Sequence, residues 1–166
     1  MKGFLSVGDW VYEGKAKTRV QDEDQVIVIP TVETDVDGGK VGDAAQFSAG
    51  LGIDIELAES FSFDTDVRFY DELYANVGAI KENLKLPSYH LFDMGISYKM
   101  FVNDATLDVR LNVNNVFDNI YISELRSARQ AGDPNGTGVL YNGIDTSNSG
   151  YFGLGRTWNV GLRYNF

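Results

Sequence analysis

The final eleven residues of the chain, 156–166, alternate strictly between apolar and polar side chains. The apolar positions are Trp158, Val160, Leu162, Tyr164 and Phe166. Such alternation predicts a β-strand with one apolar and one polar face. A strand of about 9–11 residues whose alternate positions are apolar and rich in aromatics has the length that a membrane-spanning β-barrel requires.

The same alternation recurs in four further segments: 47–57, 61–70, 92–100 and 105–114. Mid-strand charges such as Asp66, Arg68 and Arg110 fall on the polar side, and the apolar side carries no lysine or arginine. Soluble antiparallel sheets also alternate, so the pattern by itself leaves the surrounding medium open. A cation at the bilayer midplane costs about 2–4 kcal/mol, however, which explains an apolar side free of cations.

Together these segments predict an all-β fold, an antiparallel up-and-down meander of about seven strands. The expected strands are 3–12, 15–22, 45–57, 61–71, 89–101, 105–117 and 156–166. Tight turns follow three of them, and the first, at Glu13 and Gly14, makes 15–22 the hairpin partner of 3–12. Long connections are expected at about 22–40, 71–88 and 119–154. Outer-membrane barrels alternate short periplasmic turns with long external loops in this way.

The composition narrows the classes of function. The chain is 43% hydrophobic but has no run of eighteen apolar residues, so no transmembrane helix is expected. A net charge of −10 argues against a nucleic-acid partner. The absence of cysteine excludes disulfides and thiolate metal sites, and the acidic runs lack EF-hand spacing, so no metal or other cofactor is expected.

Seven strands would be an odd number, whereas bacterial barrels normally have an even one. An unclosed sheet exposes unpaired edges, which hydrocarbon does not tolerate. The N-terminal residues MKGFLSVGDW also do not read as a secretory signal. We therefore expect residues 1–166 to be the C-terminal part of a larger outer-membrane β-barrel.

Five sequence motifs resemble a known family. They are SVGDWVYE (6–13), VGDAAQFSAGLG (41–52), LPSYHLFDMGISYKM (86–100), LNVNNVFDNIYISE (111–124) and GRTWNVGLRYNF (155–166). In order and spacing they are similar to the last barrel strands of TonB-dependent outer-membrane receptors of the Bacteroidetes type. The resemblance covers most of 41–166.

The resemblance implies an active importer in the bacterial outer membrane, with a plug domain inside a barrel of about 22 strands. It implies outer-membrane lipid and the barrel-assembly machinery as partners. The plug and the TonB complex would act through a missing N-terminal part, since no plug domain is expected within 1–166. Siderophore, cobalamin, peptide and glycan all remain open as ligands, as does a surface lipoprotein partner.

The resemblance also implies roles for individual residues. Gly161, Tyr164 and Phe166 match the terminal assembly signal of outer-membrane proteins. In the last long loop, the candidate ligand contacts are Tyr121, Arg126, Arg129, Tyr141 and Tyr151. Aromatics among Asn and Asp suit a glycan or a polar chelate, although ordinary loop packing explains them equally well. The asparagines Asn112, Asn114 and Asn115 favour a structural role.

We do not expect this protein to be an enzyme. His90 is the single histidine, and in a strand Asp93 points to the opposite face, so Ser88, His90 and Asp93 cannot form a relay. Two alternatives stay open. One is a complete small outer-membrane barrel with a structural or adhesive role, and the other is a soluble β-sandwich that serves as a binding module.

Overall fold

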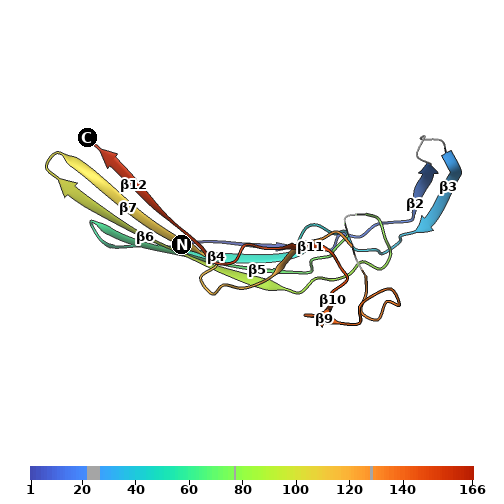
Figure 1. Ribbon diagram of the computed structural model, residues 1–166. Coiled ribbons are helices and arrows are strands. Elements are labelled where there is room, and N and C mark those ends of the chain that lie inside the picture. Colours follow the sequence, from blue (N-terminus) through green and yellow to red (C-terminus); the bar gives the residue numbers. More distant parts are fainter. Residues whose placement is uncertain (22–26, 77, 128) are drawn as a thin grey trace.

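A computed structural model describes residues 1–21, 27–76, 78–127 and 129–166, and every regular element in them is a β-strand. No helix in these ranges is long and apolar enough to cross a membrane. Six strands form one antiparallel sheet, in the order β1-β4-β5-β6-β7-β12 (Figure 1). Their bounds are β1 (Lys2–Val7), β4 (Phe47–Ala58), β5 (Phe61–Asp71), β6 (Tyr89–Val102), β7 (Ala105–Asn114) and β12 (Thr157–Asn165). The predicted all-β, antiparallel fold is confirmed.

The prediction of about seven strands in this sheet was wrong. The segment predicted as strand 15–22 forms β2 (Lys15–Gln21), which pairs with β3 (Ile27–Asp35) and not with β1. Lys17 lies opposite Glu33 and makes an ion pair with it at 3.3 Å. Residues 27–35 of the predicted loop 22–40 are therefore strand, and residues 22–26 lie outside the described ranges. The odd number of strands no longer argues for a missing one.

The β2–β3 pair extends as a separate arm beyond one end of the main sheet (Figure 1). The first predicted strand, 3–12, ends early at Val7 for a local reason. The backbone N–H of Gly8 bonds to the carbonyl of Gln46 at 2.7 Å, and the side chain of Gln46 then binds both backbone groups of Trp10. These bonds replace the ladder and turn the chain away from β4.

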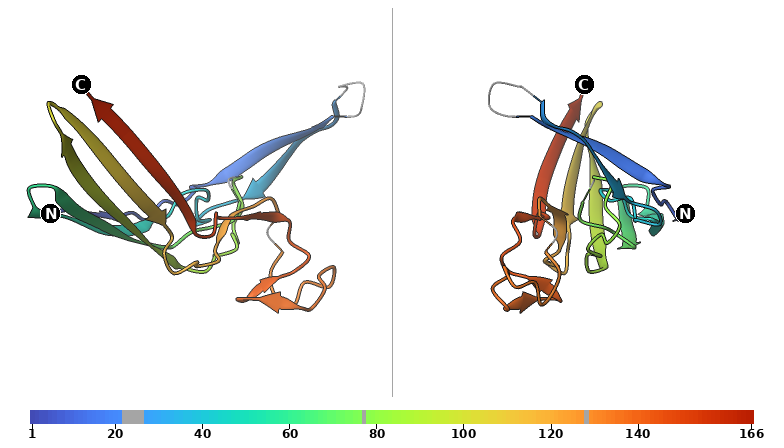
Figure 2. Two further views of the ribbon diagram at one scale, coloured as in Figure 1. Left: turned by 60° about the vertical axis from the view of Figure 1, so that its left-hand side comes forward. Right: turned by 90° about the vertical axis from the view of Figure 1, so that its right-hand side faces the viewer.

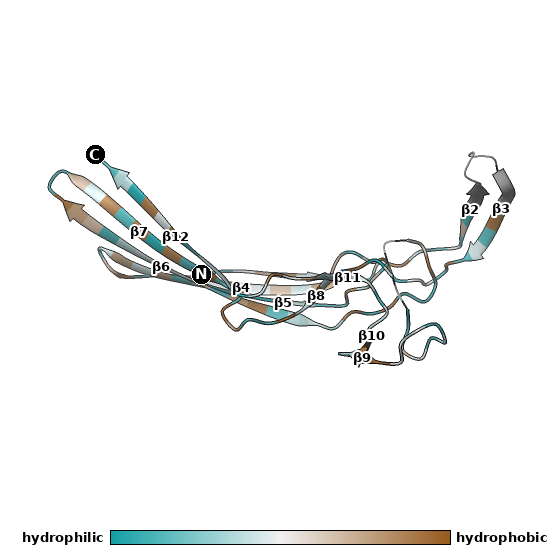
Figure 3. Ribbon diagram, viewed as in Figure 1, coloured by the Kyte–Doolittle hydropathy of each residue, from teal (hydrophilic) through white to brown (hydrophobic). Residues whose placement is uncertain are grey.

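The two faces of the sheet differ in chemistry, as the banding along β7 and β12 in Figure 3 illustrates. One cross-strand row reads Ile55, Phe63, Ile96, Leu111 and Val160. The next row reads Asp54, Asp64, Gly95, Asn112 and Asn159. The register therefore sorts the side chains into an apolar face and a polar face, as the alternation predicted.

The apolar face is defined by the alternate positions Leu5, Val7, Phe47, Ala49, Leu51, Ile53, Ile55, Phe61, Phe63, Thr65, Val67, Phe69, Phe92, Met94, Ile96, Tyr98, Met100, Leu107, Val109, Leu111, Val113, Trp158, Val160, Leu162 and Tyr164. None of these side chains is buried, and none is charged. In β5 and β6, Asp71 and His90 continue the face beyond its aromatic residues at one end.

No second layer of described residues covers either face, and Figure 2 shows the strands as one curved layer. The buried apolar cluster lies instead in the long connections. Its members are Leu73, Ala75, Leu84, Leu86, Ile122, Leu125 and Ile144. The packing of this protein is therefore concentrated at one end of an otherwise single-layered sheet.

The two ends of the sheet differ in the length of their connections. Short turns close β4–β5 and β6–β7 at one end, here the turn end, where β12 also finishes with Asn165 opposite Thr106. The connections 8–46, 72–88 and 115–156 gather at the opposite end, here the loop end. The predicted alternation of short turns and long connections is confirmed from β4 onward, whereas the predicted tight turn at 13–14 lies within the connection 8–46.

Two details at the loop end depart from the predicted boundaries. β7 stops at Asn114 and not near 117, because Asn115 adopts a left-handed backbone conformation with φ 50°. The expected loop 119–154 contains two short strand pairs. They are β8 (Ile122–Leu125) with β11 (Gly150–Phe152), and β9 (Leu140–Tyr141) with β10 (Ile144–Asp145).

Candidate functional site

Ion pairs that cross between strands organise the polar face. Lys2 of β1 lies 3.5 Å from Asp66 of β5, although β4 runs between these two strands. Two further pairs join Arg68 to Asp93 and Arg110 to Asp64. Oppositely charged groups thus satisfy one another along this face, which allows a sheet to carry charges in mid-strand.

Glycine makes one of these long-range pairs possible. Arg110 of β7 reaches Asp64 of β5 across β6, and Gly95 of β6 lies opposite Asp64 in the register. A Cβ atom at residue 95 would lie 1.9 Å from a carboxylate oxygen of Asp64. Gly95 therefore leaves the space in which the two charged side chains meet.

The polar face is hollowed toward the turn end by a cavity of about 660 Å³. Its lining includes Lys99, Asp108 and Arg163, which are neighbours in one cross-strand row. Gly161 also lines it, and no atom lies within 4 Å of the position that a Cβ atom would take there. The curved sheet therefore presents its charged side to an open, water-accessible hollow.

Aromatic side chains on the apolar face form two lines. The line near the loop end consists of Phe47, Phe69, Phe92 and Trp158, and the line near the turn end contains Phe61, Tyr98 and Tyr164. Between the lines the side chains are mainly aliphatic, for example Leu111 and Val160. An aliphatic band between aromatic borders is typical of a surface that crosses a bilayer.

The loop-end line runs diagonally across the strands. The turn-end line shifts less, by two residues over the three steps from Phe61 to Tyr164, in the same direction. From Phe47 in β4 to Trp158 in β12, the loop-end line moves six residues along the strands over four strand-to-strand steps. This is about 20 Å along the strands against about 19 Å across them. If the line lies parallel to the membrane plane, the strands are tilted by about 45°, close to the 35–45° of outer-membrane barrels.

Three stacked tyrosines attach the last long loop to the sheet. The ring of Tyr89 in β6 lies between those of Tyr70 and Tyr121, with centroid distances of 5.0 and 4.1 Å. A Cβ atom at Gly153 would lie 1.8 Å from the Tyr121 ring, so the backbone of residue 153 closes over it. Tyr121, predicted as a ligand contact, is thus occupied with neighbours from its own chain.

A cavity of about 340 Å³ lies in the same loop. Tyr141 and Tyr151 line it, together with Phe152, whose ring meets that of Tyr141 edge-on at 5.8 Å. Arg126 lies over the Tyr151 ring, 4.9 Å from its centroid, and bonds to its hydroxyl. Three of the five predicted contacts, Tyr141, Tyr151 and Arg126, are therefore brought together.

The other two predicted contacts, Tyr121 and Arg129, do not line this cavity, and Arg126 adjoins it through Tyr151. Tyr121 belongs to the tyrosine stack, and Arg129 donates from its guanidinium to the carbonyl of Asn135 at 3.3 Å. Aliphatic side chains of the buried cluster, among them Ile122 and Ile144, form the rest of the apolar lining of this cavity.

Asp145, which was not among the predicted site residues, organises this loop. Its carboxylate is 1% exposed and accepts hydrogen bonds from the hydroxyl and backbone of Ser147, at 2.6 and 2.8 Å. The backbones of Thr137 and Gly138 and the Thr137 hydroxyl also donate to it. These hydrogen bonds, of which the two from Ser147 have the largest effect, hold the pKa of Asp145 well below its usual value. Its oxygens are thus committed to the loop, which disfavours a role as a cation ligand.

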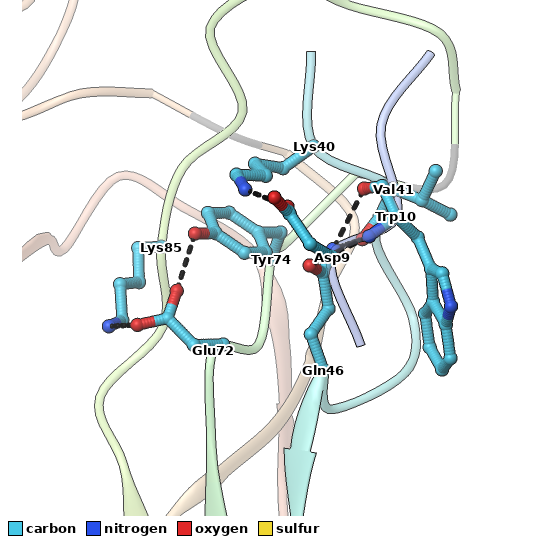
Figure 4. Close-up of polar contacts among 8 residues, drawn as sticks. All are labelled: Asp9, Trp10, Lys40, Val41, Gln46, Glu72, Tyr74 and Lys85. Atoms are coloured by element: carbon cyan, nitrogen blue, oxygen red, sulfur yellow. Dashed lines mark hydrogen bonds and ion pairs between the residues drawn. The ribbon is translucent and has the colours of Figure 1, made fainter. Parts of the chain in front are cut away.

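A second polar network joins the other connections at the loop end (Figure 4). The amide of buried Gln46 donates to the carbonyls of Trp10 and Val41, at 3.0 and 3.2 Å. Nearby, the Tyr74 hydroxyl donates to Glu72 at 2.6 Å. Burial of the Tyr74 hydroxyl is the larger cause, and its hydrogen bond to the Glu72 carboxylate the second, of a pKa raised to about 12. Glu72 also pairs with Lys85, which lowers the pKa of Glu72 and raises that of Lys85.

The asparagines of the 111–119 region have structural partners. Asn112 bonds to Asn159 at 3.0 Å on the polar face, and Asn114 bonds to Thr157 at 3.2 Å. The Asn115 side chain is buried and bonds to both backbone groups of Asn119. These contacts fit the structural role that the sequence favoured.

The predicted assembly residues lie on the exposed edge strand β12. Tyr164 and Phe166 are exposed, with ring centroids 6.2 Å apart, and the open space around Gly161 means that packing does not require glycine there. His90 continues the apolar face whereas Asp93 bonds to Arg68 on the polar face. In the described ranges, no three His, Asp or Glu side chains lie close enough to hold a metal ion.

No protein-family model, no curated protein and no solved structure matches this chain. Its function must therefore be inferred from its own residues and geometry.

Proposed function

We propose that this chain is part of the wall of an outer-membrane TonB-dependent receptor, which imports a nutrient ligand into a bacterial cell. In this proposal the apolar face contacts lipid, the polar face lines the lumen, and the loop end faces the outside. The plug domain and the segment that contacts the TonB complex would lie outside these 166 residues.

The uncovered apolar face is the observation that carries the proposal. Strands β4, β5, β6, β7 and β12 have 12, 11, 14, 10 and 9 residues, and about 9–11 suffice to span a bilayer. From strand spacing and rise, the six-stranded face covers roughly 700 Å². The largest apolar patch of a typical soluble monomer measures about 300–600 Å². A larger face, free of charge and without a covering layer, is best matched by lipid.

The polar face supports the same orientation. Its charged side chains pair across strands and border a hollow of about 660 Å³, as expected for a wall that faces water. The diagonal loop-end line of aromatic residues adds a strand tilt of about 45°, which a flat soluble sheet does not need.

The two alternatives each require something that the described residues do not supply. A soluble β-sandwich needs a second sheet packed about 10 Å from the apolar face. A complete small barrel needs β1 and β12 to pair, whereas the sheet is open with these strands at its two edges. The receptor proposal asks only that neighbouring strands continue the sheet at both edges.

Within this proposal the loop end binds the ligand. The cavity beside Tyr141, Tyr151 and Phe152 offers aromatic and aliphatic walls, and Asp145 beside it is already satisfied by the loop. Gly161, Tyr164 and Phe166 would serve the assembly machinery, by pairing of the free edge of β12.

The proposal is tested in two steps in cells of the source bacterium. The protein is first located by membrane fractionation, and the proposal expects it in the outer membrane, with slower migration on gels after heating than before. A deletion strain is then grown on limiting iron–siderophore, cobalamin, peptide or glycan. Loss of growth on one of these nutrients, restored by the gene only when the TonB complex is present, is the expected result. A water-soluble location, or restored uptake without the TonB complex, would contradict the proposal.

A further inference from the structure

A basic corner lies where the apolar face meets the loop end, just before β12. Arg156 directly precedes β12, and the strand alternation, carried back one residue from Thr157, assigns it to the same side as Trp158. Trp158 and Phe117 are 71% and 65% exposed, and the ring of Phe117 packs against that of Phe92 with centroids 5.3 Å apart. The corner thus combines a guanidinium group with three aromatic rings at one border of the apolar face.

The charge of Arg156 is not neutralised within the described ranges. Its guanidinium donates to the carbonyl of Val116 at 3.4 Å and takes part in none of the ion pairs. The contact with Asp118 is made by the backbone N–H of Arg156, at 2.7 Å. Lys85, another cation near this border, is instead held by Asp71 at 3.3 Å and by Glu72. Among the described residues at this border, Arg156 therefore carries a positive charge that no ion pair neutralises.

The two short turns at the opposite border contain Glu59 and Asp104, whereas the cations nearest to that border, Lys99 and Arg163, line the hollow of the polar face. An anionic molecule in the plane of a bilayer would thus meet the guanidinium of Arg156 at this corner and carboxylates in the turns at the other border. The planar guanidinium suits a phosphate, to which it can donate two parallel hydrogen bonds.

We propose that Arg156, with Phe92, Phe117 and Trp158, binds the phosphate headgroup of an anionic lipid in the leaflet at the loop end. This inference rests on the proposed contact of the apolar face with lipid. The aromatic rings lie at the depth of the headgroups, where such side chains anchor barrels. One basic side chain near an anionic surface favours anionic lipid about fivefold.

Trp158 is a built-in reporter of this corner. The substitution Trp10→Phe leaves it as the single tryptophan of the chain. The protein is placed in equimolar vesicles of phosphatidylglycerol and phosphatidylcholine, in which one lipid or the other carries bromine on its acyl chains. Bromine quenches tryptophan on contact, so the two quenching curves give the relative affinity of each lipid for the corner.

We expect brominated phosphatidylglycerol to show about fivefold higher affinity, falling at high salt. The preference should vanish in Arg156→Gln, persist in Arg156→Lys and persist in the control Arg163→Gln on the polar face. Quenching by brominated phosphatidylcholine should be unchanged in all variants, which verifies that they remain inserted. Equal affinities in the parent, or a preference that survives Arg156→Gln, would overturn the headgroup site. Absence of quenching by both lipids would instead overturn the lipid contact itself.

Discussion

A lysine placed in the middle of the apolar face should destabilise the protein strongly in a bilayer. Val160 is 55% exposed in the isolated sheet and lies in β12 between Trp158 and Tyr164, the aromatic residues at its two borders. With a rise of about 3.4 Å and a tilt of about 45°, Val160 lies within about 3 Å of the depth halfway between these two rings. Val160→Lys should therefore cost most of the roughly 2–4 kcal/mol measured for a cation at the bilayer midplane.

The matched control is the next residue, Gly161, which faces the hollow and has no neighbour within 4 Å of an added Cβ atom. Gly161→Lys should change the free energy of unfolding by less than about 0.5 kcal/mol, as surface substitutions do. The assay is reversible urea unfolding from lipid vesicles, with β-sheet circular dichroism as the signal. Equal effects of the two substitutions would refute the assignment of the faces, because an apolar face in water tolerates a lysine.

Three further perturbations test individual contacts. Gly95→Ala should cost about 1–3 kcal/mol in the same unfolding assay, because the added Cβ atom lies 1.9 Å from a carboxylate oxygen of Asp64, and Asp64→Ala should relieve that cost. Gly153→Ala should displace Tyr121 from its stack, since the Cβ atom would lie 1.8 Å from that ring, and should speed tryptic cleavage of loop 119–154. Because folding lowers the pKa of Asp145, its ionised carboxylate stabilises the loop at pH values above its pKa in the unfolded chain, about 4. This stabilisation is lost progressively as the pH falls from that value toward the lower pKa of the folded protein. Cleavage of the loop by pepsin should therefore rise below about pH 4, and in Asp145→Asn it should be fast already at higher pH.

The controls come from the same chain. Gly161→Ala, with open space around its Cβ atom, should leave stability and cleavage unchanged. Asp133→Asn changes a half-buried carboxylate of the same loop, which accepts a hydrogen bond from the Asn135 backbone, and should preserve the pH dependence that depends on Asp145. A stable Gly95→Ala protein, an unchanged loop in Gly153→Ala, or pH-independent cleavage would each contradict the corresponding contact.

The long strands could be predicted from the sequence because their alternation extends over nine or more residues. Strands β4, β5, β6 and β12 lie within about two residues of the predicted ranges. β7 ends earlier than predicted, since a left-handed turn at Asn115 depends on bonds to Asn119 that no local pattern reveals. Alternation identifies a strand and its faces but says little about where a turn interrupts it.

Strand partners were the weaker part of the prediction. The segment Lys15–Gln21 was expected to pair with the first strand, because the two are adjacent in sequence, yet β1 pairs with β4. The buried Gln46 decides this by holding Trp10, a contact between residues 36 positions apart. The loop residues show the same limit. Aromatic residues marked the loop cavity, whereas Asp145 and the tyrosine stack depend on long-range packing.

A residue-by-residue scan of β12 can show whether the apolar face contacts lipid while the polar face contacts water. The chain contains no cysteine, so single cysteines at 159–163 can each carry a nitroxide label. In vesicles, labels at 160 and 162 should be relaxed by oxygen dissolved in the bilayer. Labels at 159, 161 and 163 should be relaxed by a water-soluble nickel complex. A scan in which the nickel complex reaches all five positions equally, or in which 160 and 162 are shielded from both reagents, would contradict the account.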